Sequence, residues 1–137
     1  MRYSGICLLV CLTLAAACSP RGVGLDADST ESRVEMEVDG VMLKGELTPG
    51  EYTDSSGKSL PAMFFTYPCR AGADASAEAL VIALRLNKRL EKQQAAWFSV
   101  TCYQPAEGAG GRRVSITEFV RENGEWQSQP TRQSIEW

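Results

Sequence analysis

The chain has 137 residues, carries a formal charge of −3 from 14 basic and 17 acidic side chains, and contains no histidine. Without imidazole, serine–histidine and cysteine–histidine nucleophiles and the usual zinc and iron sites are excluded. The acidic balance argues against nucleic acid as a partner. We therefore expect a protein that is not an enzyme and that has no catalytic residue, metal or cofactor. The catalytic alternative is limited to carboxylate, lysine or tyrosine chemistry.

Residues 1–17 have the pattern of an export signal. Arg2 gives a positive start, and the apolar run from Ile6 to Leu14 contains no charged residue. Nine helical residues rise only about 14 Å, which is too short for a bilayer core of about 30 Å. We expect this run to be a cleaved signal and not a finished membrane span.

Small residues and a cysteine, Ala15-Ala16-Ala17-Cys18, follow the apolar run. Here the sequence resembles the lipobox of bacterial lipoproteins, with Ala15 where that family more often has leucine, and the resemblance covers residues 1–19 only. It implies cleavage before Cys18, lipid attached to Cys18 as a membrane anchor and, because Ser19 replaces the aspartate of inner-membrane lipoproteins, the periplasmic face of the outer membrane. The alternative is an ordinary secretory signal that leaves Cys18 as a plain thiol.

The sequence after the signal divides into a linker and one domain. Residues 18–33 lack periodicity and are rich in small and charged side chains, which predicts a flexible tether. Residues 34–137 have the length of a single globular domain with one core.

Two cysteines remain in that domain. Cys7 and Cys11 leave with the signal, so Cys69 and Cys102 are expected to form a disulfide in an oxidising periplasm. A redox-active pair is disfavoured because the chain has no Cys-x-x-Cys spacing.

The first predicted elements are strands. Residues 34–38 and 41–47 alternate apolar and polar side chains around Asp39-Gly40, a dipeptide typical of a type I′ hairpin turn, which places Val38 opposite Val41 and Met36 opposite Leu43. Residues 48–61 are expected to be a loop. A third strand over 63–69 follows, with Pro68 indicating a sheet edge.

Residues 75–94 fit two patterns. Leu80, Ile82, Leu84 and Leu86 alternate as in a strand, whereas the abundance of Ala, Leu, Glu, Arg, Lys and Gln favours a helix. A helical wheel favours the helix, because it separates an apolar side from a basic side. The apolar side contains Ala79, Ile82, Ala83, Leu86 and Leu90, and the basic side contains Arg85, Lys88, Arg89 and Lys92.

The rest of the sequence predicts further strands. Residues 98–102 alternate and place Cys102 on an apolar side, 105–113 form a glycine-rich loop, and 114–121 form a strand that Asn123-Gly124 turns into a hairpin. A last short strand ends near Trp137. The predicted fold class is α+β, an antiparallel sheet of about five to six strands with one packed helix. The alternative is an all-β sandwich or barrel.

The basic side of the predicted helix, Arg85, Lys88, Arg89 and Lys92, is the candidate partner-binding site, since four cations gathered in an acidic protein suit an acidic partner. The alternative is a solvated helix surface. The loop 108–113 resembles phosphate-binding loops but leads into a strand, so a plain hairpin loop is favoured. Paired Glu35 and Glu37 are interpreted as ionised surface residues and not as glycosidase acids.

These observations lead to three hypotheses of function. The first is a non-catalytic envelope lipoprotein that binds a protein partner in the periplasm, with an inhibitor or immunity protein against an envelope-acting enzyme or toxin as the favoured role. The second is an assembly or pilot lipoprotein of an outer-membrane or secretion machine. The third is an enzyme that uses carboxylates. The expected partners are the membrane, through the lipid anchor, and a protein, but not nucleic acid.

Overall fold

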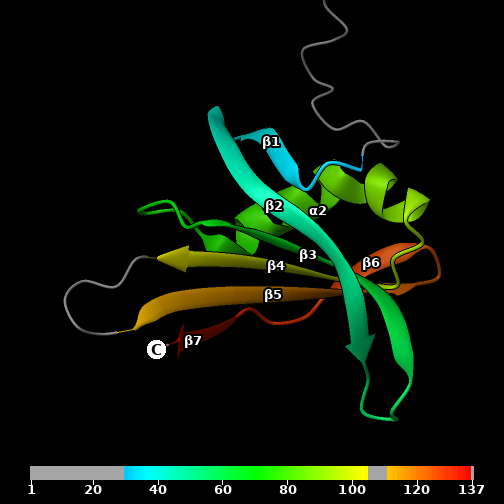
Figure 1. The fold of residues 1–137 in the computed structure, drawn as a ribbon. Helices are drawn as coiled ribbons and strands as arrows, with labels where there is room; N and C mark the ends of the chain where they lie inside the picture. Colours follow the sequence, from blue (N-terminus) through cyan, green and yellow to red (C-terminus); the bar gives the residue numbers. More distant parts are fainter. Residues whose placement is uncertain (1–29, 105–110, 137) are drawn as a thin grey trace, which may run out of the picture.

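The computed structural model describes residues 30–104 and 111–136 (Figure 1). The predicted signal, Cys18, most of the predicted tether and the centre of the glycine-rich loop lie outside the described residues. The strands of the chain form one sheet in the order β1-β2-β3-β4-β5-β6, and β7 is also paired to β5. The elements are β1 (Arg33–Val38), β2 (Val41–Thr53), β3 (Ser59–Pro68), α2 (Ala75–Lys92), β4 (Trp97–Gln104), β5 (Arg112–Glu122), β6 (Glu125–Ser128) and β7 (Arg132–Glu136).

Both predicted tight hairpins are confirmed. Asp39 and Gly40 have φ values of 50° and 78°, and the β1–β2 register pairs Met36 with Leu43 as expected. Asn123 and Gly124 have φ values of 52° and 79° between β5 and β6. Positive φ at both central residues gives the turn a twist that matches the twist of the strands it joins.

The loop predicted over 48–61 is wrong, because β2 continues to Thr53 and β3 already begins at Ser59. The remaining turn is closed by Asp54, whose Oδ1 accepts the backbone N–H of Ser56 and of Lys58, each at 2.9 Å. The hydroxyl of Ser56 also donates to this carboxylate, and this bond, followed by the backbone bonds, holds the pKa of Asp54 below its ordinary value. The ends of both strands are mostly exposed, which explains why no apolar alternation marks them.

The prediction of a purely antiparallel sheet is also wrong, because β3 and β4 are parallel. The chain leaves β3 through α2, whose 18 residues rise about 27 Å. That rise returns the chain to the end of the sheet at which β3 began, so β4 runs in the same direction. Pro68 is therefore not at a sheet edge: it ends the central strand β3, where it lies opposite Tyr103.

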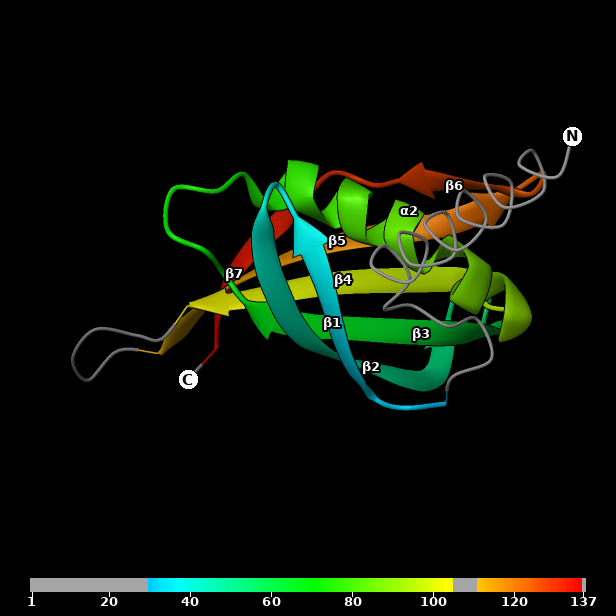
Figure 2. The same ribbon diagram turned by 90° about the horizontal axis from the view of Figure 1, so that it is seen from above.

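The structure is mostly sheet with one helix, and the sheet curls around α2 into a half-barrel, which approaches the barrel of the alternative prediction (Figure 2). Gly45 of the long strand β2 lies against the ring of Phe65. A Cβ atom at Gly45 would meet Phe65 Cζ at 2.5 Å and the carbonyl oxygen of Thr66 at 2.6 Å. A glycine is thus required for the close approach of β2 to β3.

The helix prediction is confirmed, and α2 covers the inner face of the sheet. Asp74 caps its start by accepting the N–H groups of Ser76 and Ala77. The predicted apolar side of the helix is almost fully buried, and packs against the inner side chains of β1 to β5. The buried helix residues of that side are Ala79, Ile82, Ala83, Leu86 and Leu90.

Candidate partner-binding surface

The expected disulfide is present between Cys69 and Cys102, whose Cα atoms lie 4.8 Å apart. It joins the segment after β3 to the neighbouring strand β4, and the N–H of Cys69 donates to the carbonyl of Tyr103 at 2.9 Å. The alternation of residues 98–102 had placed Cys102 on the buried side, and Cys102 is indeed buried.

A buried carboxylate lies beside the disulfide, and the sequence patterns did not identify it. Glu78, in the first turn of α2, is 3% exposed. Its Oε1 accepts the Tyr67 hydroxyl at 2.8 Å, and its Oε2 accepts Arg70 Nε at 2.6 Å and pairs with Arg70 Nη2. Arg70 also lies 3.9 Å from Asp39. This network joins the β1–β2 turn, β3 and α2.

The position of Tyr67 in this network predicts that the free energy of unfolding depends on pH. Burial first, and then the hydrogen bond to Glu78, raise the pKa of Tyr67. The neutral phenol is therefore favoured in the folded state. Its contribution to the free energy of unfolding is complete below the ordinary tyrosine pKa of about 10 and is lost as the pH rises further. We expect the free energy of unfolding to fall from about pH 10 upward. Urea titrations should show a smaller decline in Tyr67→Phe, and an equal decline in both proteins would contradict the assignment.

A polar cleft of about 430 Å³ opens where α2 begins, next to the disulfide. It contains serine hydroxyls, but the chain has no histidine that could activate them as nucleophiles. Among the described residues, no group of three or more cysteine, aspartate or glutamate side chains is arranged to hold a metal ion. The lining residues include Arg70, Asp74, Ser76, Glu78, Arg113, Ser115 and Gln133.

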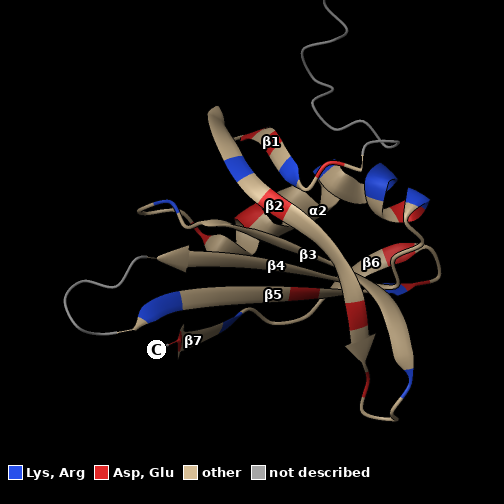
Figure 3. Ribbon diagram, in the orientation of Figure 1, with Lys and Arg blue, Asp and Glu red and all other residues tan. Residues whose placement is uncertain are grey.

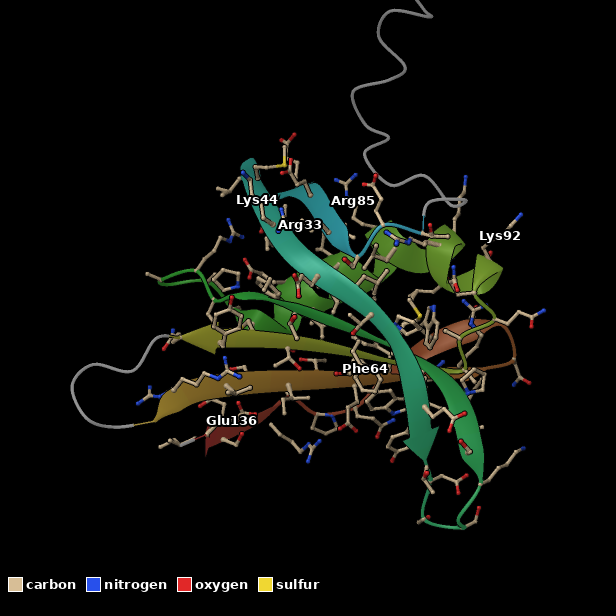
Figure 4. All side chains as sticks on the ribbon, viewed as in Figure 1. Arg33, Lys44, Phe64, Arg85, Lys92 and Glu136 are labelled. Atoms are coloured by element: carbon tan, nitrogen blue, oxygen red, sulfur yellow. A yellow bond between two sulfur atoms is a disulfide. The ribbon has the colours of Figure 1, made fainter. Side chains whose placement is uncertain are left out.

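The four predicted cations of α2 do not form one exposed stripe. Arg85, Lys88 and Lys92 are exposed. Figure 3 shows the basic positions of the helix in blue, and Figure 4 labels Arg85 and Lys92. Arg89 is only 5% exposed, and its Nη2 donates to the carbonyl of Glu31, just before β1. Burial lowers the pKa of Arg89, while the charge of Glu31 opposes this shift. Arg89 therefore connects α2 to the segment just before β1, and it is removed from the candidate site.

This difference predicts opposite outcomes for two neighbouring arginines. Arg89→Glu places a carboxylate in a buried position beside Glu31, and should lower the free energy of unfolding by about 3–5 kcal/mol. Arg85→Glu changes an exposed side chain for which the described residues show no partner, and should change it by less than about 0.5 kcal/mol. Chemical denaturation of both variants measures the contrast. Equal effects would mean that Arg89 is also a solvated cation.

An apolar feature of α2 lies beside the remaining cations. Leu80 and Leu84, one turn apart, are 50% and 69% exposed. They line a groove of about 340 Å³ whose other wall includes Trp126 of β6. Lys88 is one turn beyond Leu84, so the two side chains are neighbours on the helix surface. We call Leu80, Leu84, Arg85, Lys88 and Trp126 the α2 docking surface.

Hydrogen bonds hold the groove wall in place. Asn87 Oδ1 accepts Trp126 Nε1 at 3.1 Å and Arg121 Nη2 at 3.0 Å. The Arg121 guanidinium lies 4.5 Å above the Trp126 ring and its Nη1 is 3.6 Å from Glu91. The β5–β6 hairpin is thus fixed against α2.

The sequence contained a signal for this surface. On the helical wheel Leu80 and Leu84 lie away from the buried side, and two leucines one turn apart on an outward helix side indicate a contact surface. Their place in the competing strand alternation obscured this reading. Glu35 and Glu37 are exposed on β1, as interpreted from the sequence.

Within residues 30–104 and 111–136, no helix has the length and apolarity needed to span a bilayer. Neither a family model, nor a curated protein sequence, nor a solved structure matches the chain.

Proposed function

We propose that this chain is an envelope lipoprotein, anchored through Cys18 to the periplasmic face of the outer membrane, whose folded part binds a protein partner without catalysing a reaction. The favoured role is that of an inhibitor or immunity protein against an envelope-acting enzyme or toxin. The α2 docking surface is the single observation that supports partner binding.

The chemistry of this surface suits a protein partner. Exposed leucines contribute affinity when they are removed from water, by about 25 cal/mol per Å² of apolar area. Arg85 and Lys88 have no partner among the described residues, so they are available to an acidic surface. Such cations mainly raise the association rate and select the orientation of the partner. A rigid tryptophan beside the leucines is typical of interface centres.

The anchor is tested by replacing the cysteine of the lipobox. Cells that express the full chain with Cys18→Ser should show no incorporation of radiolabelled palmitate and should accumulate the uncut precursor. The matched control is Cys11→Ser, which leaves the lipobox intact and should be labelled like the unsubstituted chain. Palmitate labelling of Cys18→Ser would overturn the anchor.

Partner binding is tested with variants of the docking surface. The full chain is used to capture proteins from an envelope extract, and the association rate of the captured protein is then measured at low ionic strength. Arg85→Glu with Lys88→Glu should slow association by about tenfold or more. Leu80→Ser with Leu84→Ser should weaken binding by a factor that changes little with ionic strength. The control is Lys44→Glu with Lys58→Glu, which makes the same change of charge on exposed positions of β2 and of the β2–β3 turn.

Equal association by all of these variants would overturn the docking surface. The identity of the captured protein decides the role. An enzyme or toxin whose activity falls when the chain is added supports an inhibitor or immunity protein. A subunit of an outer-membrane or secretion machine, with no activity to inhibit, supports the assembly role in its place.

A further inference from the structure

We propose that two copies of this chain associate through β7, which pairs with β7 of the second copy in an antiparallel ladder centred on Ser134. This interaction surface is independent of the α2 docking surface. Among the described residues, β7 is paired with β5 only, and all five of its residues are exposed. Its second edge therefore has backbone groups available to another strand.

The sequence of β7 is complementary to itself in this register. A two-fold axis at Ser134 places Arg132 of one copy opposite Glu136 of the other, and does so twice. Directly opposite side chains of opposite charge stabilise an antiparallel pair. Gln133 then lies opposite Ile135, and the two Ser134 residues face one another.

The charges inside one copy extend this complementarity. Glu136 already accepts Arg112 Nη2 at 2.9 Å, and Arg132 is paired with Glu118 of β5. Glu136 lies at the outer edge of the sheet (Figure 4). The dimer would therefore give a row that alternates in sign across the joint: Arg112, Glu136, then Arg132 and Glu118 of the second copy.

An exposed apolar side chain is also covered. Ile135 is 56% exposed, although it lies next to paired strands. In the proposed register the two Ile135 side chains are diagonal neighbours, about 7–8 Å apart at the backbone and within reach of each other. Association would reduce the exposure of both side chains to water.

The charge pattern of the opposite edge disfavours the corresponding central register. If β1 were paired with itself about Met36, Glu35 would lie opposite Glu37 of the second copy. Like charges directly opposite destabilise such a pair. In β7 the central register instead brings unlike charges together.

Cysteine trapping tests the register. Opposite residues of an antiparallel pair have Cα atoms about 4.5–5.5 Å apart, within the range of a disulfide, whereas diagonal residues exceed it. The full chain with Ser134→Cys, expressed in an oxidising periplasm, should give about tenfold more disulfide-linked dimer than Gln133→Cys or the unsubstituted chain. Non-reducing electrophoresis measures the yield. Equal dimer in all three would overturn the proposal.

Charge reversal separates contact between copies from effects within one copy. Arg132→Glu and Glu136→Arg, each combined with Ser134→Cys, place like charges opposite one another in their own homodimers. A mixture restores both unlike pairs, so differently tagged chains should form heterodimers at least about fivefold in excess of a statistical mixture. The contacts to Glu118 and Arg112 that each substitution breaks lie within one copy, so they are lost equally whether that copy is in a homodimer or in a heterodimer. A statistical mixture would contradict pairing through β7.

Discussion

Replacing Cys69 and Cys102 together with alanine is expected to lower the free energy of unfolding by about 3–4 kcal/mol. The bridge closes a loop with a sequence separation of 33 residues, and such a loop restricts the unfolded chain by this amount in the chain-entropy model. For a domain of about 100 residues the loss corresponds to a fall in Tm of roughly 10 to 20 °C. Thermal and urea unfolding of the full chain measure both quantities.

The control separates the covalent link from the side chains. The unsubstituted chain in excess reductant keeps both sulfur atoms but loses the bond, so it should be destabilised nearly as much as the double alanine variant. Replacement of buried Cys102 alone adds only a small cavity. A double variant that loses less than about 1 kcal/mol would show that the bridge contributes little to this fold.

Features that depend on local chemistry could be predicted from the sequence. Asp39-Gly40 and Asn123-Gly124 each fix a two-residue turn, because their positive φ values determine the register of the flanking strands. The disulfide followed from the cysteine count and from the alternation around Cys102. The helix followed from a separation of apolar and charged side chains that no strand would give.

Features that depend on distant segments could not be predicted. The strand ends at residues 48–53 and 59–61 have little apolar character, and they are ordered by backbone pairing between β2 and β3. The parallel pairing of β3 with β4 requires knowledge of where α2 returns the chain. The need for glycine at position 45 appears only when Phe65 lies over it.

Arg89 shows how a helical wheel can mislead. It is seven residues after the buried Ile82, so the two side chains point within about 20° of each other. The wheel grouped Arg89 with Arg85 because of its charge, although its direction is that of the core. Its burial depends on a hydrogen bond to a backbone carbonyl 58 residues away, which no local pattern contains.

Glu78→Leu is expected to destabilise the folded chain by about 3–5 kcal/mol, although leucine is apolar and the position is buried. The substitution leaves Arg70, whose side chain is 24% exposed, without its closest carboxylate, and leaves the Tyr67 hydroxyl without its acceptor. A charge or hydroxyl that is buried without a partner costs more than the same group in water. The loss should therefore come from the partners and not from leucine itself.

A triple variant tests that reason. Glu78→Leu combined with Arg70→Met and Tyr67→Phe removes the partners together with the carboxylate, and should lose less than half of what Glu78→Leu loses alone. The effects of the three substitutions are strongly non-additive in this case, because the residues contact one another. Glu78→Gln is the matched control, since the amide oxygen can still accept one donor. If the losses caused by Arg70→Met and Tyr67→Phe alone simply add to the loss caused by Glu78→Leu in the triple variant, the three residues are not coupled. Packing at the start of α2 then determines the stability.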